Sequence, residues 1–238
     1  MDSLVVKTKL IGKFKDFFAE FDFSGATSIR FYNTLLHQAK KNNAQKYILD
    51  YFKLIDSPYT DDVKEKLKSK EFKLLIEELK TIESDIHINK RLEIYYGNQG
   101  GGKTTTAMEK YPDAYVMTCN SSFEPNDLIE SFDFVDGKPK YKNSPMLNAM
   151  IEGKPIILDE MNLLTRNCLR AVQGWLDNKD QFIYKDKLIP INEGFKIIAT
   201  MNLEVNGQIE ELPAPLVDRA YEIVEMIPSN EFIAKLAF

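Results

Sequence analysis

The sequence predicts an α/β protein in which a parallel five-stranded sheet is preceded by a small helical bundle. From residue 91 onward, short apolar runs alternate with helical segments, which is typical of a parallel sheet covered on both faces. In about the first 85 residues, apolar side chains instead recur at helical spacing, and glycine occurs only at Gly12 and Gly25. We therefore expect a helical domain over residues 1–85 and an α/β core over residues 86–238.

The N-terminal region reads as three or more short amphipathic helices. Ser57 and Pro58 interrupt the pattern, and Thr60 with Asp61 and Asp62 marks a helix start with acids near its positive end. Lysines between positions 64 and 70 alternate with acids, which favours a solvated helix face over a nucleic-acid contact. Because this region carries no catalytic constellation, we expect it to serve assembly or partner docking. The apolar positions that carry the pattern are Ile48, Tyr51, Phe52, Ile55, Leu67, Leu75, Leu79 and Ile82.

Composition limits the class of protein. The formal net charge of −5 argues against nonspecific coating of nucleic acid, although it leaves a local basic lining possible. The two cysteines, Cys119 and Cys168, lie in apolar stretches that suggest core positions. They provide no disulfide framework, which favours a reducing compartment. No segment has the length or apolar character of a signal peptide or a membrane span. We expect a cytoplasmic protein, bacterial or in a host cytosol if it is viral, with no membrane partner.

Five apolar runs are the candidate strands of the core. They cover residues 92–96, 114–119, 155–159, 195–200 and 220–225. Their lengths and flanking polar residues fit buried parallel strands. The segments between them are long enough for crossover helices, as parallel neighbours require.

A glycine-rich loop follows the first strand and fits the pattern G-x-x-x-x-G-K-[ST] at every fixed position. Glycines let the backbone curl so that successive N–H groups converge on phosphate oxygens. Lys103 is placed to reach the β- and γ-phosphates, and the Thr104 hydroxyl to join a magnesium shell. The helix that follows turns its positive end toward the anion. The predicted nucleotide-binding residues are Gly97, Asn98, Gln99, Gly100, Gly101, Gly102, Lys103, Thr104 and Thr105.

Two acids end the third strand. The carboxyl edge of a parallel sheet is where such folds bind ligands, so Asp159 is placed to hold Mg²⁺ with Thr104, and Glu160 to orient the attacking water. The alternative is that both acids cap the next helix. The phosphate loop in the same chain favours the catalytic interpretation.

Two further polar residues follow later strands. Asn202, at the tip of the fourth strand, is placed to contact the γ-phosphate or its attacking water, although asparagine is also a common turn residue. Arg219 precedes the last strand, and its plain alternative is a surface ion pair with Asp218.

Together these motifs resemble AAA+ ATPases, and most closely the clade of MoxR, dynein-related and McrB proteins. The resemblance covers about residues 91–226. It rests on the loop, on the run from Ile156 to Asn162, on the strand ending Ala199-Thr200-Met201-Asn202, and on the segment from Leu212 to Arg219. Members of the clade insert a hairpin into the helix between strands two and three, which matches residues 132–141 with a turn at Asp136-Gly137. A helix over residues 163–177 and a second hairpin over residues 182–191 fit the same pattern.

The resemblance implies ATP hydrolysis with Mg²⁺ in an oligomeric ring, commonly hexameric. Asn202 would then be the sensor residue and Arg219 an arginine finger offered to the neighbouring subunit, with Lys103 and Glu160 acting in the same reaction. Only 19 residues follow Arg219, too few for the helical lid of the family, and Ala220 replaces the usual aromatic residue. The core is therefore expected to lack a C-terminal lid, and the alternatives are that the chain is shortened or that another element takes its place.

The resemblance leaves the partner and the base open. One candidate is a remodeller of proteins. A second is a viral or phage DNA-acting motor of the superfamily 3 helicase type, with a helical bundle before a lidless core. A third is a non-hydrolysing switch, which the intact acid pair disfavours. Because McrB-like relatives use GTP, the sequence does not decide between ATP and GTP. Lys138, Lys140 and Lys142 on the first hairpin are candidate DNA contacts, although a solvated turn is slightly favoured.

Overall fold

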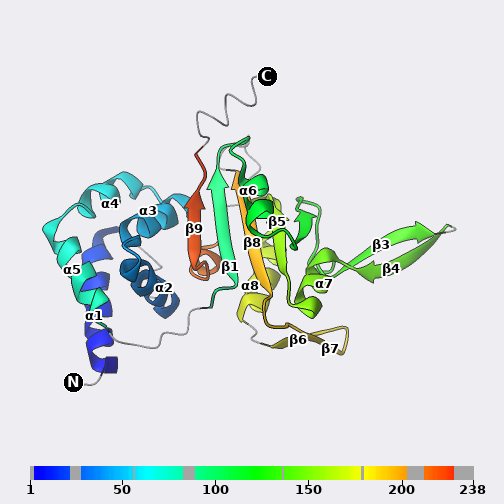
Figure 1. Cartoon of the computed structure of the whole chain (residues 1–238), viewed down its shortest axis with the longest axis horizontal. Coiled ribbons are helices and arrows are strands. Elements are labelled where there is room, and N and C mark those ends of the chain that lie inside the picture. The colour runs from blue at the N-terminus through cyan, green and yellow to red at the C-terminus, as the bar shows by residue number, and fades with distance from the viewer. Residues whose placement is uncertain are drawn as a thin grey trace. The chain divides into compact units, whose positions relative to one another are not determined.

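The computed structural model describes residues 3–21, 28–55, 57–82, 89–135, 137–177, 180–202 and 212–227 (Figure 1). The chain divides into two compact units. Unit 1 comprises residues 1–89 with 211–221, and unit 2 comprises residues 90–210 with 222–238. The predicted boundary near residue 85 falls at residues 83–88, outside the described part of the chain. Segment 211–221, which the sequence-based division assigned to the core, groups with the N-terminal helices.

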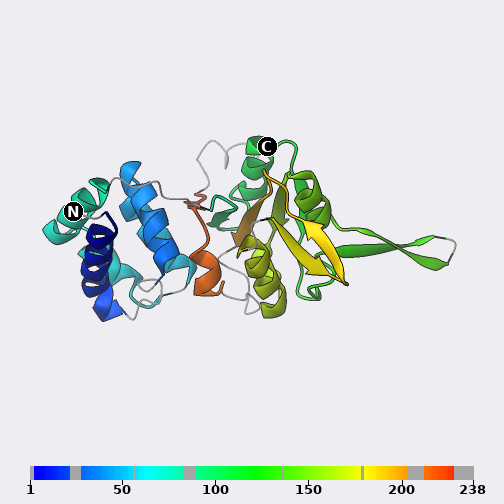
Figure 2. The ribbon, with the colours of Figure 1, turned by 90° about the horizontal axis from the view of Figure 1, so that it is seen from below.

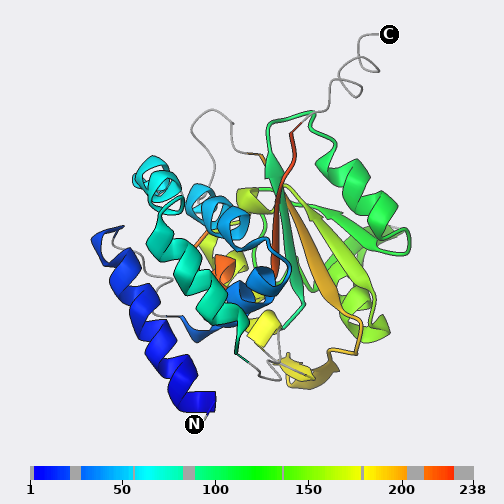
Figure 3. The ribbon, with the colours of Figure 1, turned by 60° about the vertical axis from the view of Figure 1, so that its left-hand side comes forward.

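Unit 1 is built from the predicted amphipathic helices, which lie side by side in Figure 3. Ser28 and Ser69 accept hydrogen bonds from the backbone N–H groups of Phe31 and Phe72, capping the second and the last of the long helices. Thr60 begins a helix but does not cap it. Its hydroxyl donates instead to the Ser57 carbonyl at 2.7 Å. The helices are α1 Ser3–Phe18, η1 Ala19–Phe21, α2 Ile29–Lys40, α3 Ala44–Leu54, α4 Thr60–Lys66 and α5 Lys70–Lys80.

Aromatic side chains fill the core of unit 1. Phe14 and Phe18 of α1, Phe31 of α2, and Tyr51 and Phe52 of α3 are at most 1% exposed. The rings of Phe31 and Tyr51 meet edge to face, with centroids 5.3 Å apart. Large buried rings of this kind provide most of the hydrophobic stabilisation that a small bundle needs.

Unit 2 contains the predicted five-stranded parallel sheet, with strand order β2-β5-β8-β1-β9. This confirms the predicted fold class. The strands are β1 Leu92–Gly97, β2 Tyr115–Thr118, β5 Pro155–Asp159, β8 Lys196–Asn202 and β9 Glu222–Glu225. The last strand starts two residues later than predicted, because the N–H of Ala220 closes a turn onto the Val217 carbonyl. Strand β8 runs two residues further than predicted, through Asn202.

Helices cover both faces of the sheet (Figure 2). They are α6 Lys103–Lys110, α7 Pro145–Glu152 and α8 Arg166–Asp177, with a short 3-10 helix, η3 Met161–Leu163, before α8. Trp175, the only tryptophan in the sequence, is 8% exposed on α8 and packs against Phe182, with ring centroids 5.7 Å apart. No helix in the described ranges has both the length and the apolar character needed to cross a bilayer.

A buried acid fixes α6 to the sheet. Glu93 of β1 is fully buried and accepts hydrogen bonds from Lys110 Nζ at 2.9 Å, from Lys196 Nζ at 3.2 Å, and from the hydroxyls of Tyr95 and Tyr111. These donors come from the end of α6 and from β1 and β8. Removing one partner of a buried, hydrogen-bonded charge is strongly destabilising. The cluster therefore holds the helix that carries Lys103 against its neighbouring strands.

Both predicted hairpins form. The first, β3 Glu130–Val135 and β4 Lys138–Asn143, extends away from the sheet (Figure 1). Its turn residue Asp136 lies outside the described residues. The expectation that it interrupts a helix is wrong for its N-terminal side, where residues 121–129 form turns and irregular backbone. The Asn120 side chain accepts from the N–H of Ser122, which competes with helical hydrogen bonding. The second hairpin is β6 Gln181–Tyr184 and β7 Lys187–Pro190.

Candidate functional site

Strand register brings the predicted site residues to one edge of the sheet. Gly97, the last residue of β1, pairs with Asn202, the last residue of β8. On the other side of β8, Leu158 of β5 pairs with Ala199, so that Asp159 and Thr200 follow side by side. Residues about 100 positions apart in sequence thus meet at the carboxyl ends of three adjacent strands.

The loop between β1 and α6 requires glycine at two kinds of position. Gly100 and Gly102 have φ of +77° and +75°, in the left-handed region, and Gly102 caps α6. Gly97 has φ of +145°, and a Cβ there would lie 2.4 Å from the Met226 carbonyl oxygen, which follows β9. The loop therefore turns sharply from the strand into the N-terminus of an eight-residue helix, a geometry suited to binding an anion.

Lys103 is held beneath this loop. It is 7% exposed, and its Nζ donates to the carbonyl oxygens of Gly97 at 3.0 Å and Asn98 at 2.7 Å. Burial lowers the pKa of Lys103, while the nearby charges of Asp159 and Glu160 raise it. The net effect lowers the pKa of Lys103, and its Nζ is held by the two loop carbonyls.

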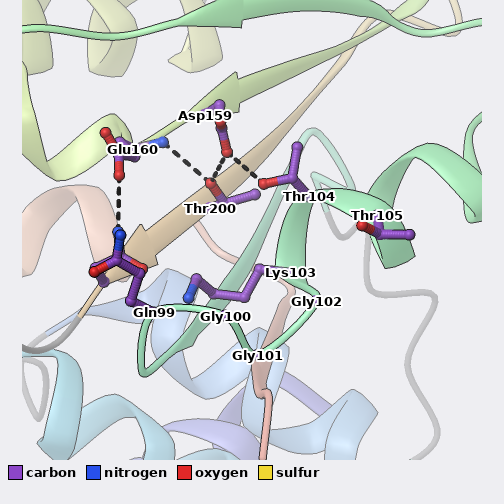
Figure 4. Close-up of a pocket in the computed structure, with 11 residues that line it drawn as sticks. Gln99, Gly100, Gly101, Gly102, Lys103, Thr104, Thr105, Asp159, Glu160 and Thr200 are labelled. Carbon is purple, nitrogen blue, oxygen red and sulfur yellow. Dashed lines mark hydrogen bonds between the residues drawn. The ribbon is translucent and has the colours of Figure 1, made fainter. Parts of the chain in front are cut away.

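Asp159 joins two hydroxyl groups. Its Oδ1 accepts from Thr104 Oγ1 and from Thr200 Oγ1, each at 2.6 Å (Figure 4). A carboxylate beside a threonine hydroxyl provides hard oxygen ligands of the kind that Mg²⁺ prefers. Within the described residues, no three His, Cys, Asp or Glu side chains gather to form a metal cage. The oxygens present fit Mg²⁺, which is usually bound through one or two carboxylates together with substrate phosphates and water.

Glu160 has an unusual backbone and a fixed side chain. Its φ of +58° lies in the left-handed region, which costs a non-glycine residue of order 1–3 kcal/mol and is found mainly at functional sites. Its N–H donates to Thr200 Oγ1 at 3.0 Å, and its Oε1 accepts from Asn202 Nδ2 at 2.9 Å. The adjacent acids are thus directed apart, because Asp159 contacts Thr104 (Figure 4) and Glu160 contacts Asn202.

Thr200 is a site residue to which the sequence analysis gave no role, although it lies within a quoted motif. It is 1% exposed, and its hydroxyl donates to Asp159 and accepts from the Glu160 N–H. In the sequence it is one β-branched residue in an apolar strand, where threonine is ordinary. Asn162 was quoted only as part of a motif. It is 1% exposed and donates to the Asn202 carbonyl at 3.3 Å, while its Oδ1 has no partner among the described residues.

Replacing Thr200 with valine keeps the shape of the side chain but removes its hydroxyl. We expect turnover to fall about tenfold to a hundredfold, because Asp159 loses a donor and the strained Glu160 backbone loses its acceptor, each interaction being worth about 1–2 kcal/mol. Serine at the same position should restore most of the rate, which steady-state kinetics will test. Equal rates for the valine and serine variants would contradict this role of the hydroxyl.

These groups line a cavity of about 280 Å³. Its walls are residues 99–105 with Asp159, Glu160, Thr200 and Asn202. Gly97 and Asn98, also predicted to bind the ligand, contribute carbonyls to Lys103 and do not line the cavity. Behind Asp159, burial raises the pKa of the Cys119 thiol to about 12, an effect that the Asp159 charge increases. Cys119 and Cys168 are both buried, as predicted.

Arg219, predicted to be catalytic, does not line this cavity either. It belongs to unit 1, where its guanidinium donates to the Pro215 carbonyl. Its predicted role requires a site on a second copy of the chain.

Comparisons with known proteins identify the family of the chain. Residues 94–220 match the family described as AAA domain (dynein-related subfamily). Midasin from Giardia intestinalis is 29% identical over 93 residues, which is 36% of this chain but only 2% of that protein. A solved structure of a candidate ATPase from Cytophaga hutchinsonii is 20% identical, with a TM-score of 0.49 over 62% of this chain and 45% of the other.

Proposed function

Since the chain belongs to the dynein-related subfamily of AAA domains, we propose that it hydrolyses ATP with Mg²⁺ at the subunit interfaces of an oligomeric ring. The energy of hydrolysis would be used to remodel or translocate a macromolecular partner. The observation that carries the proposal is the arrangement around Asp159. One carboxylate contacts the loop threonine, while the next residue, Glu160, is held by Asn202. Residues 99–105, Asp159 and Glu160 thus line one cavity, which supports proposed roles in binding phosphate, holding Mg²⁺ and activating water.

Each group has a distinct task in this reaction. The loop N–H groups and the Lys103 ammonium bind the β- and γ-phosphates. Thr104 and Asp159 would hold Mg²⁺, which neutralises charge on the phosphates when bound. Glu160 orients and polarises the attacking water, and Asn202 fixes the Glu160 carboxylate. Arg219 stabilises charge on the transferred phosphoryl group of the neighbouring subunit.

Replacing Glu160 with glutamine should preserve nucleotide binding and slow hydrolysis by at least about two orders of magnitude, the typical loss on removing a general base. Glutamine keeps the shape and can still accept from Asn202, so the site should remain assembled. Fluorescent-nucleotide titration and phosphate release measure the two effects separately. If Asp159→Asn and Glu160→Gln both lose only affinity, with normal turnover at saturation, the proposed division of roles is wrong.

The hairpin of β3 and β4 is the surface proposed to contact the partner. Phe132, Phe134 and Tyr141 are 53%, 70% and 67% exposed. Phe132 pairs with Tyr141 and Phe134 with Pro139, so these side chains share one face of the ribbon. An exposed cluster of aromatic rings is unusual on a surface with no partner. We favour a protein partner for this reason.

A DNA partner is the second candidate, because Lys138, Lys140 and Lys142 alternate with these side chains along β4 and occupy the opposite face. One assay tests the proposal and separates the candidates, namely phosphate release from ATP and from GTP, each with and without single-stranded and duplex DNA. ATP turnover that DNA does not change supports the protein remodeller. A rise with DNA favours the DNA motor, a preference for GTP corrects the base, and no turnover with either nucleotide contradicts the proposal.

A further inference from the structure

The segment that carries Arg219 is attached to the N-terminal helices. It comprises residues 212–221, with a short helix α9 Ala214–Val217 followed by a turn. In sequence the segment lies between β8 and β9, which are strands of unit 2, yet the segment belongs to unit 1. Leu216, Val217 and Ala220 are fully buried, so the turn is held on either side of Arg219.

Three buried side chains hold this turn by hydrogen bonds. Gln38 Nε2 donates to the Tyr221 carbonyl at 2.7 Å, and the Tyr47 hydroxyl donates to the Ala220 carbonyl at 3.2 Å. The Tyr51 hydroxyl donates to Asp218 Oδ1 at 2.6 Å. The donors come from α2 and α3 and are at most 3% exposed. The residues immediately before and after Arg219 are thus both fixed by α3.

The Asp218 carboxylate interacts with residues of the helical bundle as well as with Arg219. Burial raises the pKa of the Asp218 carboxyl, and hydrogen bonds from Tyr51 and Ser28 and the charges of Arg219 and Arg30 lower it. A hydrogen bond to a charged, partly buried group is worth about 1.5–3 kcal/mol, more than an exposed ion pair. Tyr51 therefore anchors the turn through its strongest available acceptor.

We propose that Tyr51, assisted by Tyr47, is a positioning residue that holds Arg219 in the orientation needed to act on the neighbouring subunit's nucleotide. This inference rests on the proposed function of Arg219. The contacts that support it are the hydrogen bonds to Asp218 and Ala220 from one helix of the bundle. It makes the N-terminal helices part of the catalytic apparatus. A bound partner that displaces α3 would displace Arg219 and change the rate of hydrolysis in the neighbouring subunit.

Tyr51→Phe in the full-length chain tests the proposal, because it removes one hydroxyl and keeps the ring. We expect kcat to fall about tenfold to a hundredfold, as small misplacements of catalytic groups do, with KM and nucleotide affinity within about twofold of wild type. Tyr59→Phe is the matched control. Tyr59 lies at the start of α4 in the same unit and packs on Phe21. The Tyr59→Phe protein should hydrolyse ATP at the wild-type rate.

Subunit mixing separates positioning from a loss of structure. Tyr51→Phe keeps an intact phosphate loop, so adding Lys103→Ala subunits, which carry a well-placed Arg219, should restore part of its activity. Thr200→Val has a defective cavity and should gain nothing from the same partner. Arg219→Ala subunits should not rescue Tyr51→Phe, because neither carries a correctly placed arginine.

Asp218→Leu gives a second, independent variant of similar size, because leucine offers no acceptor to the Tyr51 hydroxyl. It should reproduce the lower kcat, and the double variant should be no slower than the slower single variant, since both changes break one contact. Normal turnover of Tyr51→Phe beside a slow Arg219→Ala overturns this inference alone. A slow Tyr51→Phe that Lys103→Ala cannot rescue, while Arg219→Ala is rescued, overturns it as well. Normal turnover of Arg219→Ala overturns the proposed role of the arginine and, with it, the inference.

Discussion

Arg219→Ala is expected to bind ATP normally and to hydrolyse it about three to five orders of magnitude more slowly than the wild type, the loss seen when an arginine finger is removed. If Arg219 only formed a partly exposed ion pair with Asp218, the change would cost about 0–1 kcal/mol and leave turnover intact. The two interpretations therefore differ by at least about a thousandfold in rate. Phosphate release at saturating ATP measures the difference, and nucleotide titration verifies that binding is unchanged.

Complementation tests whether Arg219 acts between subunits. Mixed with Lys103→Ala, the Arg219→Ala protein should regain part of its activity, because one variant provides the intact loop and the other the intact arginine. Arg170→Ala is the matched control, since Arg170 is an exposed arginine on α8 whose loss should not change turnover. If mass measurement shows mixed assemblies and no activity returns, Arg219 does not act in trans.

Lys103→Ala is the second variant with a very large expected effect, a loss of hydrolysis to background. Lys103 is 7% exposed, and its ammonium donates to two loop carbonyls, so we expect it to provide the main charge at the β- and γ-phosphates. Losing one charge-assisted contact of about 1.5–3 kcal/mol should weaken nucleotide binding about tenfold to a hundredfold. Fluorescent-nucleotide titration measures the affinity, and phosphate release measures the rate.

Two controls define this result. Lys154→Ala removes a partly exposed lysine of the same unit, whose partner is the exposed Glu152. It should leave both quantities unchanged. Lys103→Arg retains the charge, but a planar guanidinium does not match the compact ammonium and should not restore hydrolysis. Normal turnover by Lys103→Ala would remove the basis for assigning the loop to phosphate binding.

Local patterns in the sequence predicted the fold and most residues of the cavity. The loop is recognisable because glycine spacing and a Lys-Thr pair are requirements of a short backbone segment. Asp159 and Glu160 are recognisable because charge directly after an apolar strand marks the edge of a sheet. Both signals lie within about eight consecutive residues. The parallel order of the strands then brought these segments together.

What the sequence did not reveal depends on contacts between distant residues. Thr200 looks like any β-branched strand residue, and only the register of β5 and β8 shows that it joins Asp159 to Glu160. Glu93 is an acid in an apolar strand, made tolerable by lysines 17 and 103 residues away. The attachment of Arg219 to the helical bundle involves partners separated by 167–183 residues, which leave no local pattern.

The packing of Trp175 against Phe182 gives the molecule an intrinsic optical reporter. Because the sequence has one tryptophan, tryptophan fluorescence reports on a single place, the C-terminal end of α8. Its indole is nearly buried and rests on the first strand of the second hairpin, so any displacement of that hairpin admits water to the ring and shifts the emission to longer wavelength. Movement of α8 relative to β6 during a nucleotide cycle can therefore be recorded in real time on the unlabelled chain.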